Sequence, residues 1–290
     1  MKKYYILSII FLLIIVGCIV IYNNLSTEKS ETFTVYEDNV EYFSKYGRIA
    51  KVNWESVNLE NSGFENVEDF LLDIDYYVDA ISQYVGKPDW KETYREKRGD
   101  DFKFKIGISF IDGGSHVLGG YNHYKHLRLG FKLSRSFFEC NRAPIAHEIT
   151  HLIVPYYSSL SLREGLASYI QDTIGKNPSL FNQGKPIIPL SKEFLLEENI
   201  ENSMDVIMNI GTEGIPKGIN ITASDIETRK KFYFLSYSFS KYLIDEYGIE
   251  KFMEIYEAKD LNTKYEELYE KSLEELKNDW INYVRAYEDN

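Results

Sequence analysis

Two histidines, His147 and His151, stand four residues apart in a short apolar segment between Pro144 and Pro155. Pro144 fits the first turn of a helix and Pro155 ends the segment after about two to three turns, so the sequence predicts a short helix here. Residues four apart share a helix face, and the apolar neighbours predict that this face is at least partly buried. Two buried histidines without a polar partner would be costly, so the spacing favours a shared metal ion.

Glu148 follows the first histidine and completes the pattern His-Glu-x-x-His. Catalytic zinc sites use three protein ligands, often histidines, and a water molecule in the fourth position. The metal lowers the pKa of this water toward about 7, so a neighbouring carboxylate can take its proton near neutral pH. We therefore interpret His147 and His151 as ligands of one Zn2+ ion per chain, and Glu148 as the general base. The alternative is a surface helix with two solvated histidines.

The third ligand has to come from a second helix. Glu164 follows His151 by 13 residues, after a turn at residues 155–159. The same glutamate fits a capping box with Ser161, in which its side chain would bond to the first amide of its own helix. Asp172 is the other nearby carboxylate and lies about two turns further along. The spacing favours Glu164 as the ligand and leaves its capping role as the competing interpretation.

Alternating apolar and polar residues predict two half-buried strands upstream of the histidines, at residues 102–110 and 127–133. If the second strand forms a sheet edge beside the site, an extended peptide could pair with it by strand addition. Residues 67–85 instead repeat apolar positions every three or four residues, as amphipathic helices do. The chain is predicted to be helical from residue 226 onward, whereas residues 175–224 show no clear pattern.

These patterns predict an α+β fold. A small mixed sheet, with an edge strand beside the His-Glu-x-x-His helix, is followed by a mostly helical C-terminal half. With 290 residues and 44% hydrophobic content, the chain is long enough to bury a full core. Its net charge of −12 argues against nucleic acid as a partner, because a phosphate-binding surface needs clustered lysines and arginines.

The order His-Glu-x-x-His and then Glu-Gly-Leu-Ala-x-Tyr, at residues 164–169, resembles the gluzincin zinc metallopeptidases, particularly the group called peptidase MA-like. The likeness covers about residues 67–287 and includes a tyrosine-rich helix ending in a Tyr-Gly pair at 247–248. The resemblance implies that Glu164 is the third zinc ligand and Glu148 the base. The chain departs from the family pattern just before Glu164. The family commonly has a tryptophan two or three residues before the ligand glutamate, whereas this chain has Ser-Leu-Arg at residues 161–163.

Two tyrosines in the tyrosine-rich helix, Tyr233 and Tyr237, stand four residues apart. The resemblance implies a tyrosine or histidine that stabilises the oxyanion of the reaction, and Tyr233 occupies the better-matching position. The alternative is a tyrosine packed in the core with its hydroxyl satisfied. Three further histidines, His116, His123 and His126, precede the site, and we expect them to be solvated or packed on strands and not to hold a second metal ion.

Residues 1–22 contain two lysines followed by an apolar run of 19 residues. At the helical rise this run spans about 28 Å, the thickness of a bilayer's hydrocarbon core. The lysines favour a cytoplasmic N-terminus, which places the rest of the chain outside. We interpret the run as an uncleaved membrane anchor. Lipidation at Cys18, within a lipobox-like sequence, and a cleaved secretory signal are the alternatives.

The rest of the chain divides into a polar stalk at residues 23–34 and an ectodomain at residues 35–290. Cys140 is the one cysteine in this ectodomain, so no disulfide can form within it. We predict that Cys140 is a buried small hydrophobic residue and not a nucleophile.

The sequence therefore predicts a membrane-anchored zinc peptidase whose ectodomain lies outside the cytoplasm and acts on a peptide or protein substrate. One Zn2+ ion and no organic cofactor are expected. The alternatives are a non-catalytic, zinc-containing surface binding domain and a zinc hydrolase that acts on a non-peptide amide or ester. The sequence makes no prediction about oligomeric state, cleavage specificity or the role of residues 175–224.

Overall fold

The computed structural model describes residues 41–98, 104–118, 129–177, 182, 184–221 and 225–288. The predicted anchor at 1–22, with Cys18, and the polar stalk at 23–34 lie outside these residues. Within the described part of the chain, no helix has both the length and the apolar character needed to cross a bilayer.

A five-stranded mixed sheet occupies the N-terminal part, with the strand order β1-β2-β3-β5-β4. Its strands are β1 (Glu41–Phe43), β2 (Gly47–Ala50), β3 (Ile106–Ile111), β4 (His116–Val117) and β5 (Gly130–Ser134). The central strands β2, β3 and β5 are parallel, whereas β1 and β4 pair antiparallel to their neighbours. Ile106, Ile108 and Phe110 of β3 are buried, as the alternating pattern predicts.

The edge strand beside the histidines is β4. The condition for strand addition at residues 127–133 is not met, because β5 pairs with β3 on one side and with β4 on the other. The chain turns at residues 112–114 after β3, and β4 then pairs with the outer side of β5. The strand β4 therefore ends the sheet, and β5 lies between β3 and β4. A strand paired on both sides has no free main-chain groups for strand addition, so β5 cannot bind a peptide in this way.

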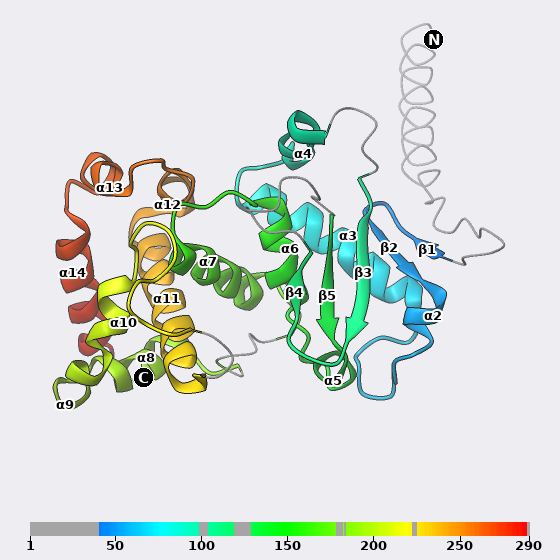
Figure 1. Cartoon of the computed structure of the whole chain (residues 1–290), viewed down its shortest axis with the longest axis horizontal. Helices are drawn as coiled ribbons and strands as arrows, with labels where there is room; N and C mark the ends of the chain where they lie inside the picture. The colour runs from blue at the N-terminus through cyan, green and yellow to red at the C-terminus, as the bar shows by residue number, and fades with distance from the viewer. Residues whose placement is uncertain are drawn as a thin grey trace, which may run out of the picture.

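Helices accompany the sheet: α2 (Lys51–Trp54), α3 (Val67–Tyr84), α4 (Trp90–Arg98) and α5 (Arg135–Glu139). The predicted helix at residues 67–85 is confirmed as α3, which runs behind the sheet in Figure 1. The Asn66 side chain caps it by accepting a hydrogen bond from the Asp69 amide at 3.0 Å. The apolar stripe of α3 is buried, including Phe70, Ile74 and Ile81.

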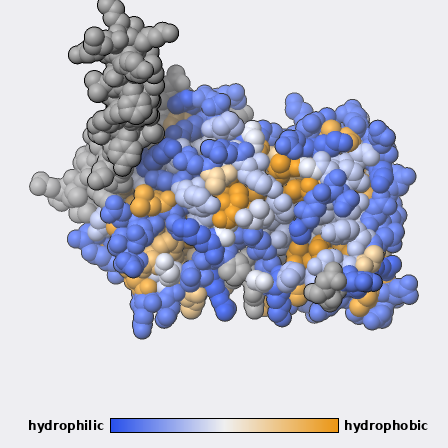
Figure 2. Space-filling model, turned by 180° about the vertical axis from the view of Figure 1, so that it is seen from behind, coloured by the Kyte–Doolittle hydropathy of each residue, from blue (hydrophilic) through white to orange (hydrophobic). Residues whose placement is uncertain are grey.

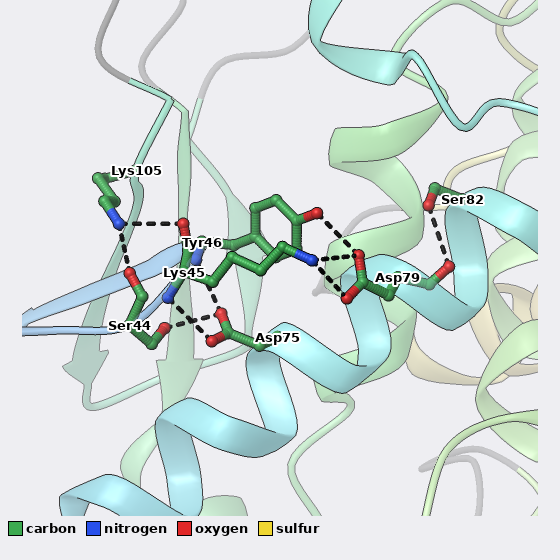
Figure 3. A network of polar contacts seen from close by, with 7 residues as sticks. All are labelled: Ser44, Lys45, Tyr46, Asp75, Asp79, Ser82 and Lys105. Atoms are coloured by element: carbon green, nitrogen blue, oxygen red, sulfur yellow. Dashed lines mark hydrogen bonds and ion pairs between the residues drawn. The ribbon is translucent and has the colours of Figure 1, made fainter. Parts of the chain in front are cut away.

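Two aspartates of α3 tie this helix to the turn between β1 and β2 (Figure 3). Asp75 accepts hydrogen bonds from the Ser44 hydroxyl (2.8 Å) and from the amides of Lys45 (2.9 Å) and Tyr46 (2.8 Å). One turn later, Asp79 accepts from the Tyr46 hydroxyl at 2.7 Å and the Lys45 ammonium at 2.9 Å. The turn amides therefore have charged acceptors, which fixes α3 relative to the sheet.

The C-terminal half is mostly helical, as predicted. Its elements are α6 (Ile145–Ile153), α7 (Leu160–Thr173), α8 (Ile187–Leu195), α9 (Glu197–Ile200), η1 (Glu201–Ser203), α10 (Met204–Asn209), α11 (Ile226–Tyr247), α12 (Ile249–Tyr256), α13 (Leu261–Tyr269) and α14 (Leu273–Ala286). In Figure 1, α6 lies between the sheet and α7, and α7 leads into the helical half. The unpatterned stretch at 175–224 contains α8, α9, η1 and α10, which are too short to show a clear period.

Cys140 is exposed, so the prediction that it is buried is wrong. It directly follows the short helix α5, and Asn141 continues the chain in the left-handed region with φ 56°. Free cysteines are usually buried. Cys140 is exposed because it lies in a surface turn directly after α5.

The surface carries no single large apolar area on the face drawn in Figure 2, where hydrophobic residues lie in separate patches among hydrophilic ones. The large hydrophobic side chains that are exposed in the described part of the chain come from several different elements: Val52, Leu72, Tyr76, Met204, Met208, Ile215 and Ile226. Scattered exposed residues of this kind are normal for globular proteins.

The helices α7 and α11 approach each other closely at Gly165. A Cβ atom at this glycine would lie 2.9 Å from the Cβ atom of Ser240 and would overlap the Ser240 hydroxyl and the main-chain oxygen of Ser236. Ser236 and Ser240 are one turn apart on α11, so small residues line both sides of the crossing. Gly165 therefore sets the distance between the two helices.

We predict that Gly165→Ala lowers the free energy of unfolding by about 1–3 kcal/mol, because the added methyl group overpacks the crossing. Alanine is intrinsically favoured over glycine inside a helix by about 1 kcal/mol, so a net loss would show that the overlap outweighs helix propensity. Urea denaturation measures the change. Gly114→Ala is the control, since a Cβ there meets no atom within 4 Å, and an equal effect of both substitutions would contradict the packing argument.

Candidate metal centre

His147, His151 and Glu164 form one buried cluster of metal-ligating side chains. The two histidines lie one turn apart on α6, and Glu164 comes from α7. Their exposed fractions are 7%, 6% and 5%. The Nε2 atoms of the two histidines are 3.1 Å apart, and Oε2 of Glu164 lies 3.3 Å from the first and 3.5 Å from the second.

These separations fit three ligands of one tetrahedral metal ion. Ligand atoms at about 2.0–2.1 Å from a tetrahedral zinc ion are about 3.3–3.4 Å from each other. A hydrogen bond between a charged imidazole and a carboxylate would be shorter, at about 2.7–2.9 Å. The observed carboxylate distances of 3.3 and 3.5 Å match the first geometry better than the second. Two imidazoles and one carboxylate are also an established ligand set of catalytic zinc sites, so the cluster can hold one ion.

The polar ends of α6 are satisfied by side chains from other elements, which holds both histidines in place. All nine residues of α6 are buried, so unpaired main-chain groups at its ends would be costly. At the N-terminal end, the His147 amide donates to Oε1 of Gln171 on α7 at 3.0 Å. At the other end, two carbonyls accept from the hydroxyls of Tyr94 (2.6 Å) and Tyr256 (3.1 Å).

Sequence reasoning did not identify these supporting residues. Gln171 follows Glu164 by seven positions, or about two turns, so helical spacing could have placed both on the α7 face that meets α6. Tyr94 and Tyr256 come from distant parts of the chain, and no local pattern singles them out.

Glu164 is a ligand candidate and not a capping residue. The helix α7 is preceded by Ser159, which makes no side-chain capping bond, so Glu164 lies a full turn inside the helix and faces α6. The Ser161 hydroxyl accepts a hydrogen bond from the Gly211 amide at 2.7 Å instead. A capping box with Ser161 would require the helix to begin at Leu162. Because α7 begins at Leu160, the capping-box interpretation is wrong.

Arg163 binds the second oxygen of the Glu164 carboxylate, with Nη1 and Oε1 2.8 Å apart. Burial alone raises the pKa of this carboxyl, but Arg163 and the two histidines outweigh burial and hold the pKa well below its usual value. Burial and the charge of Arg163 lower the pKa of His151 to about 3. At neutral pH, Glu164 is therefore ionised and His151 is neutral, which are the states that metal ligands need.

A cavity of about 730 Å³ opens onto the cluster. Its lining includes the three ligand candidates, Glu148, Tyr233 and the segment 113–117 that contains β4. Glu148 is only 4% exposed, and burial raises the pKa of its carboxyl to about 7. A carboxylate beside the first histidine, with a pKa near neutrality, can both accept and return a proton.

The structure separates the two candidate tyrosines. Tyr233 lines the cavity, and the charge of Glu164 together with burial raises the pKa of its hydroxyl above the usual value, so it remains a hydrogen-bond donor. The Tyr237 hydroxyl instead donates to Asp172 at 2.9 Å. Asp172 also accepts from Asn182 and is not part of the metal cluster.

His116, the one other histidine in the described part of the chain, does not join this cluster. His116 lies on β4, where it is exposed and lines the same cavity, and its Nδ1 is 3.1 Å from the Gly114 carbonyl. His123 and His126 lie outside the described residues. Within the described part of the chain, His147, His151 and Glu164 are the one group that could hold a metal ion.

No family model, curated protein or solved structure matches the chain. The site is therefore assigned from its own geometry and donor set.

We predict that the purified chain binds one zinc ion and that Glu164→Ala weakens the affinity by a factor of about 100 or more. Loss of a residue that merely supports a ligand costs about 10–100-fold, so loss of a direct ligand should cost at least as much. Metal analysis after dialysis gives the stoichiometry, and competition with a chromogenic chelator gives the affinity. Asp172→Asn is the matched control and should bind zinc like the wild type. Equal affinity in Glu164→Ala and the wild type would contradict the assignment.

Proposed function

We propose that the chain is a zinc-dependent peptidase of gluzincin type. The observation that carries this proposal is the buried His147, His151 and Glu164 cluster, which faces a cavity that Glu148 also lines. The order of these residues along the chain resembles that of the gluzincin metallopeptidases, and this resemblance supports peptides as the substrate class.

Zinc bound at this cluster would supply a Lewis acid that polarises the substrate carbonyl and makes a water molecule more acidic. Glu148 takes a proton from the attacking water and then passes it to the leaving amine. The Tyr233 hydroxyl donates a hydrogen bond to the carbonyl oxygen as negative charge develops there, and a donor in this position is worth about 3 kcal/mol. Glu148 and Tyr233 both line the cavity that opens onto the ligand cluster.

The state of Glu148 favours an enzyme over a non-catalytic binding domain. Its side chain is only 4% exposed and lines the cavity, and burial raises the pKa of its carboxyl to about 7. A carboxyl group with a perturbed pKa in a cavity is typical of functional sites. A zinc hydrolase of non-peptide amides or esters would use the same residues, and parallel assays with peptide and non-peptide substrates distinguish it from a peptidase.

We further propose that the protein is anchored in a membrane through residues 1–22, with residues 35–290 outside the cytoplasm. The apolar run after two lysines supports this proposal. Protease accessibility of the ectodomain on intact cells tests it, and protection from added protease would contradict it.

Glu148→Gln should lower peptide turnover by about 10²–10⁴-fold, because the amide cannot accept the proton of the attacking water. Zinc content should stay at the wild-type value, since Glu148 is outside the ligand cluster. The measurement is the rate of product formation from a peptide library, beside metal analysis of the same samples. Glu246→Gln, at an exposed glutamate, is the control. Unchanged turnover in Glu148→Gln would exclude it as the base, and a wild type that binds peptides without cleaving them would favour the binding domain.

Tyr233→Phe should lower kcat by about 100-fold with little change in KM, because its hydroxyl acts on charge that develops during the reaction. Tyr237→Phe is a matched control on the same helix, since the hydroxyl of Tyr237 is bound to Asp172. Steady-state kinetics on one peptide substrate compare the two variants. Similar kcat values for Tyr233→Phe and the wild type would assign Tyr233 a packing role.

A further inference from the structure

Arg229 lies in the cavity of the metal centre and has no part in the proposed chemistry. It is in the first turn of α11, four residues before Tyr233, and both side chains line the cavity. Residues four apart share a helix face, so the face of α11 that presents Tyr233 also presents this guanidinium. The side chain of Arg229 is half-buried.

The neighbouring cations have partners within the protein. Arg163 is paired with Glu164, and Lys231 lies 3.1 Å from Glu227. Lys230 lies over the Phe234 ring, 5.4 Å from its centroid. By contrast, no described residue forms an ion pair or a side-chain hydrogen bond with the guanidinium of Arg229. A half-buried guanidinium with five donors is costly without acceptors, which favours an acceptor that arrives with a ligand.

The charges that line the cavity favour an anion. The carboxylates of Glu148 and Glu164 offset the guanidiniums of Arg163 and Arg229, so a divalent cation at the metal centre would leave the cavity positively charged. This local sign is opposite to the net charge of the whole chain, which is −12. A cleft with such a field attracts negatively charged groups, and a guanidinium binds a carboxylate through two parallel hydrogen bonds.

We propose that Arg229 is a specificity residue that binds a carboxylate of the substrate, so that the enzyme prefers peptides with a carboxylate near the bond that is cleaved. This inference rests on the proposed function, because it takes the cavity at the metal centre as the substrate site. The carboxylate belongs either to an acidic side chain or to the free C-terminus of a short peptide. Both offer the same two oxygens to the guanidinium.

A binding experiment tests Arg229 without turnover. The probes are pairs of alkyl hydroxamates, which chelate zinc, with either a carboxylate or its carboxamide at the far end and with several linker lengths. The zinc-loaded wild type should bind the best acid about tenfold more tightly than its amide, as a charged hydrogen bond predicts. Arg229→Gln should remove this preference, and Arg229→Lys should keep part of it, since lysine retains the charge but not the planar fork. Lys230→Gln is the matched control and should keep the full preference.

A cleavage experiment identifies the source of the carboxylate. A random peptide library, with free or amidated C-termini, is digested by the wild type and by Arg229→Gln, and the products are identified by mass spectrometry. Enrichment of Asp and Glu at one position next to the cleaved bond assigns an acidic side chain. Cleavage at a fixed distance from a free C-terminus, lost on amidation, assigns the terminal carboxylate. Either preference should be lost in Arg229→Gln.

The two experiments separate failure of this inference from failure of the proposed function. An acid-to-amide preference that is the same in Arg229→Gln and the wild type overturns the inference, while peptide cleavage by both still supports the peptidase. A preference that depends on Arg229 in a chain that cleaves no peptide keeps the anion site and overturns the peptidase. If the wild-type chain binds no zinc, both this inference and the proposed function are overturned.

Discussion

The structure depends on the complete burial of α6, a helix of nine residues that carries two histidines and a glutamate between the sheet and the helical half. Such a helix is stable in an apolar interior only if the main-chain polar groups at its ends have partners. Gln171, Tyr94 and Tyr256 supply those partners at its two ends, and the histidines turn toward Glu164. The same contacts that make burial tolerable also fix the direction of the imidazoles. Packing and site geometry are therefore set together.

Three consecutive residues of α7, the second helix of the site, contact different neighbours. Arg163, Glu164 and Gly165 are consecutive, and each serves a different neighbour: Arg163 holds one carboxylate oxygen, Glu164 presents the other to the histidines, and Gly165 lets α11 approach. Because α11 also carries Tyr233 and Arg229, the close crossing at Gly165 brings both side chains to the cavity.

The parts of the site that sequence predicts are those governed by helical periodicity. The spacing of His147 and His151 was sufficient to predict that both imidazoles face the same way, because residues four apart share a helix face. The predicted α+β fold is also confirmed. The sequence favoured Glu164 as a ligand but left its capping role open, and the structure decides between the two because α7 begins at Leu160, two residues before a capping box would need. The strand β4 has two residues, too few for a detectable alternation, so the sequence did not reveal it as the edge strand. Arg229 is one of many lysines and arginines in the sequence, and only tertiary packing distinguishes it.

The position of the cluster across α6 and α7 has a mechanical consequence. A metal ion there would bond to residues from both helices, and so would act as a cross-link at the junction between the sheet and the helical half. Because the unfolded chain does not hold these three residues together, the bound ion stabilises the folded state by mass action, by about 4 kcal/mol when its free concentration is a thousand times the dissociation constant. Metal supply would then govern what fraction of the chain is folded.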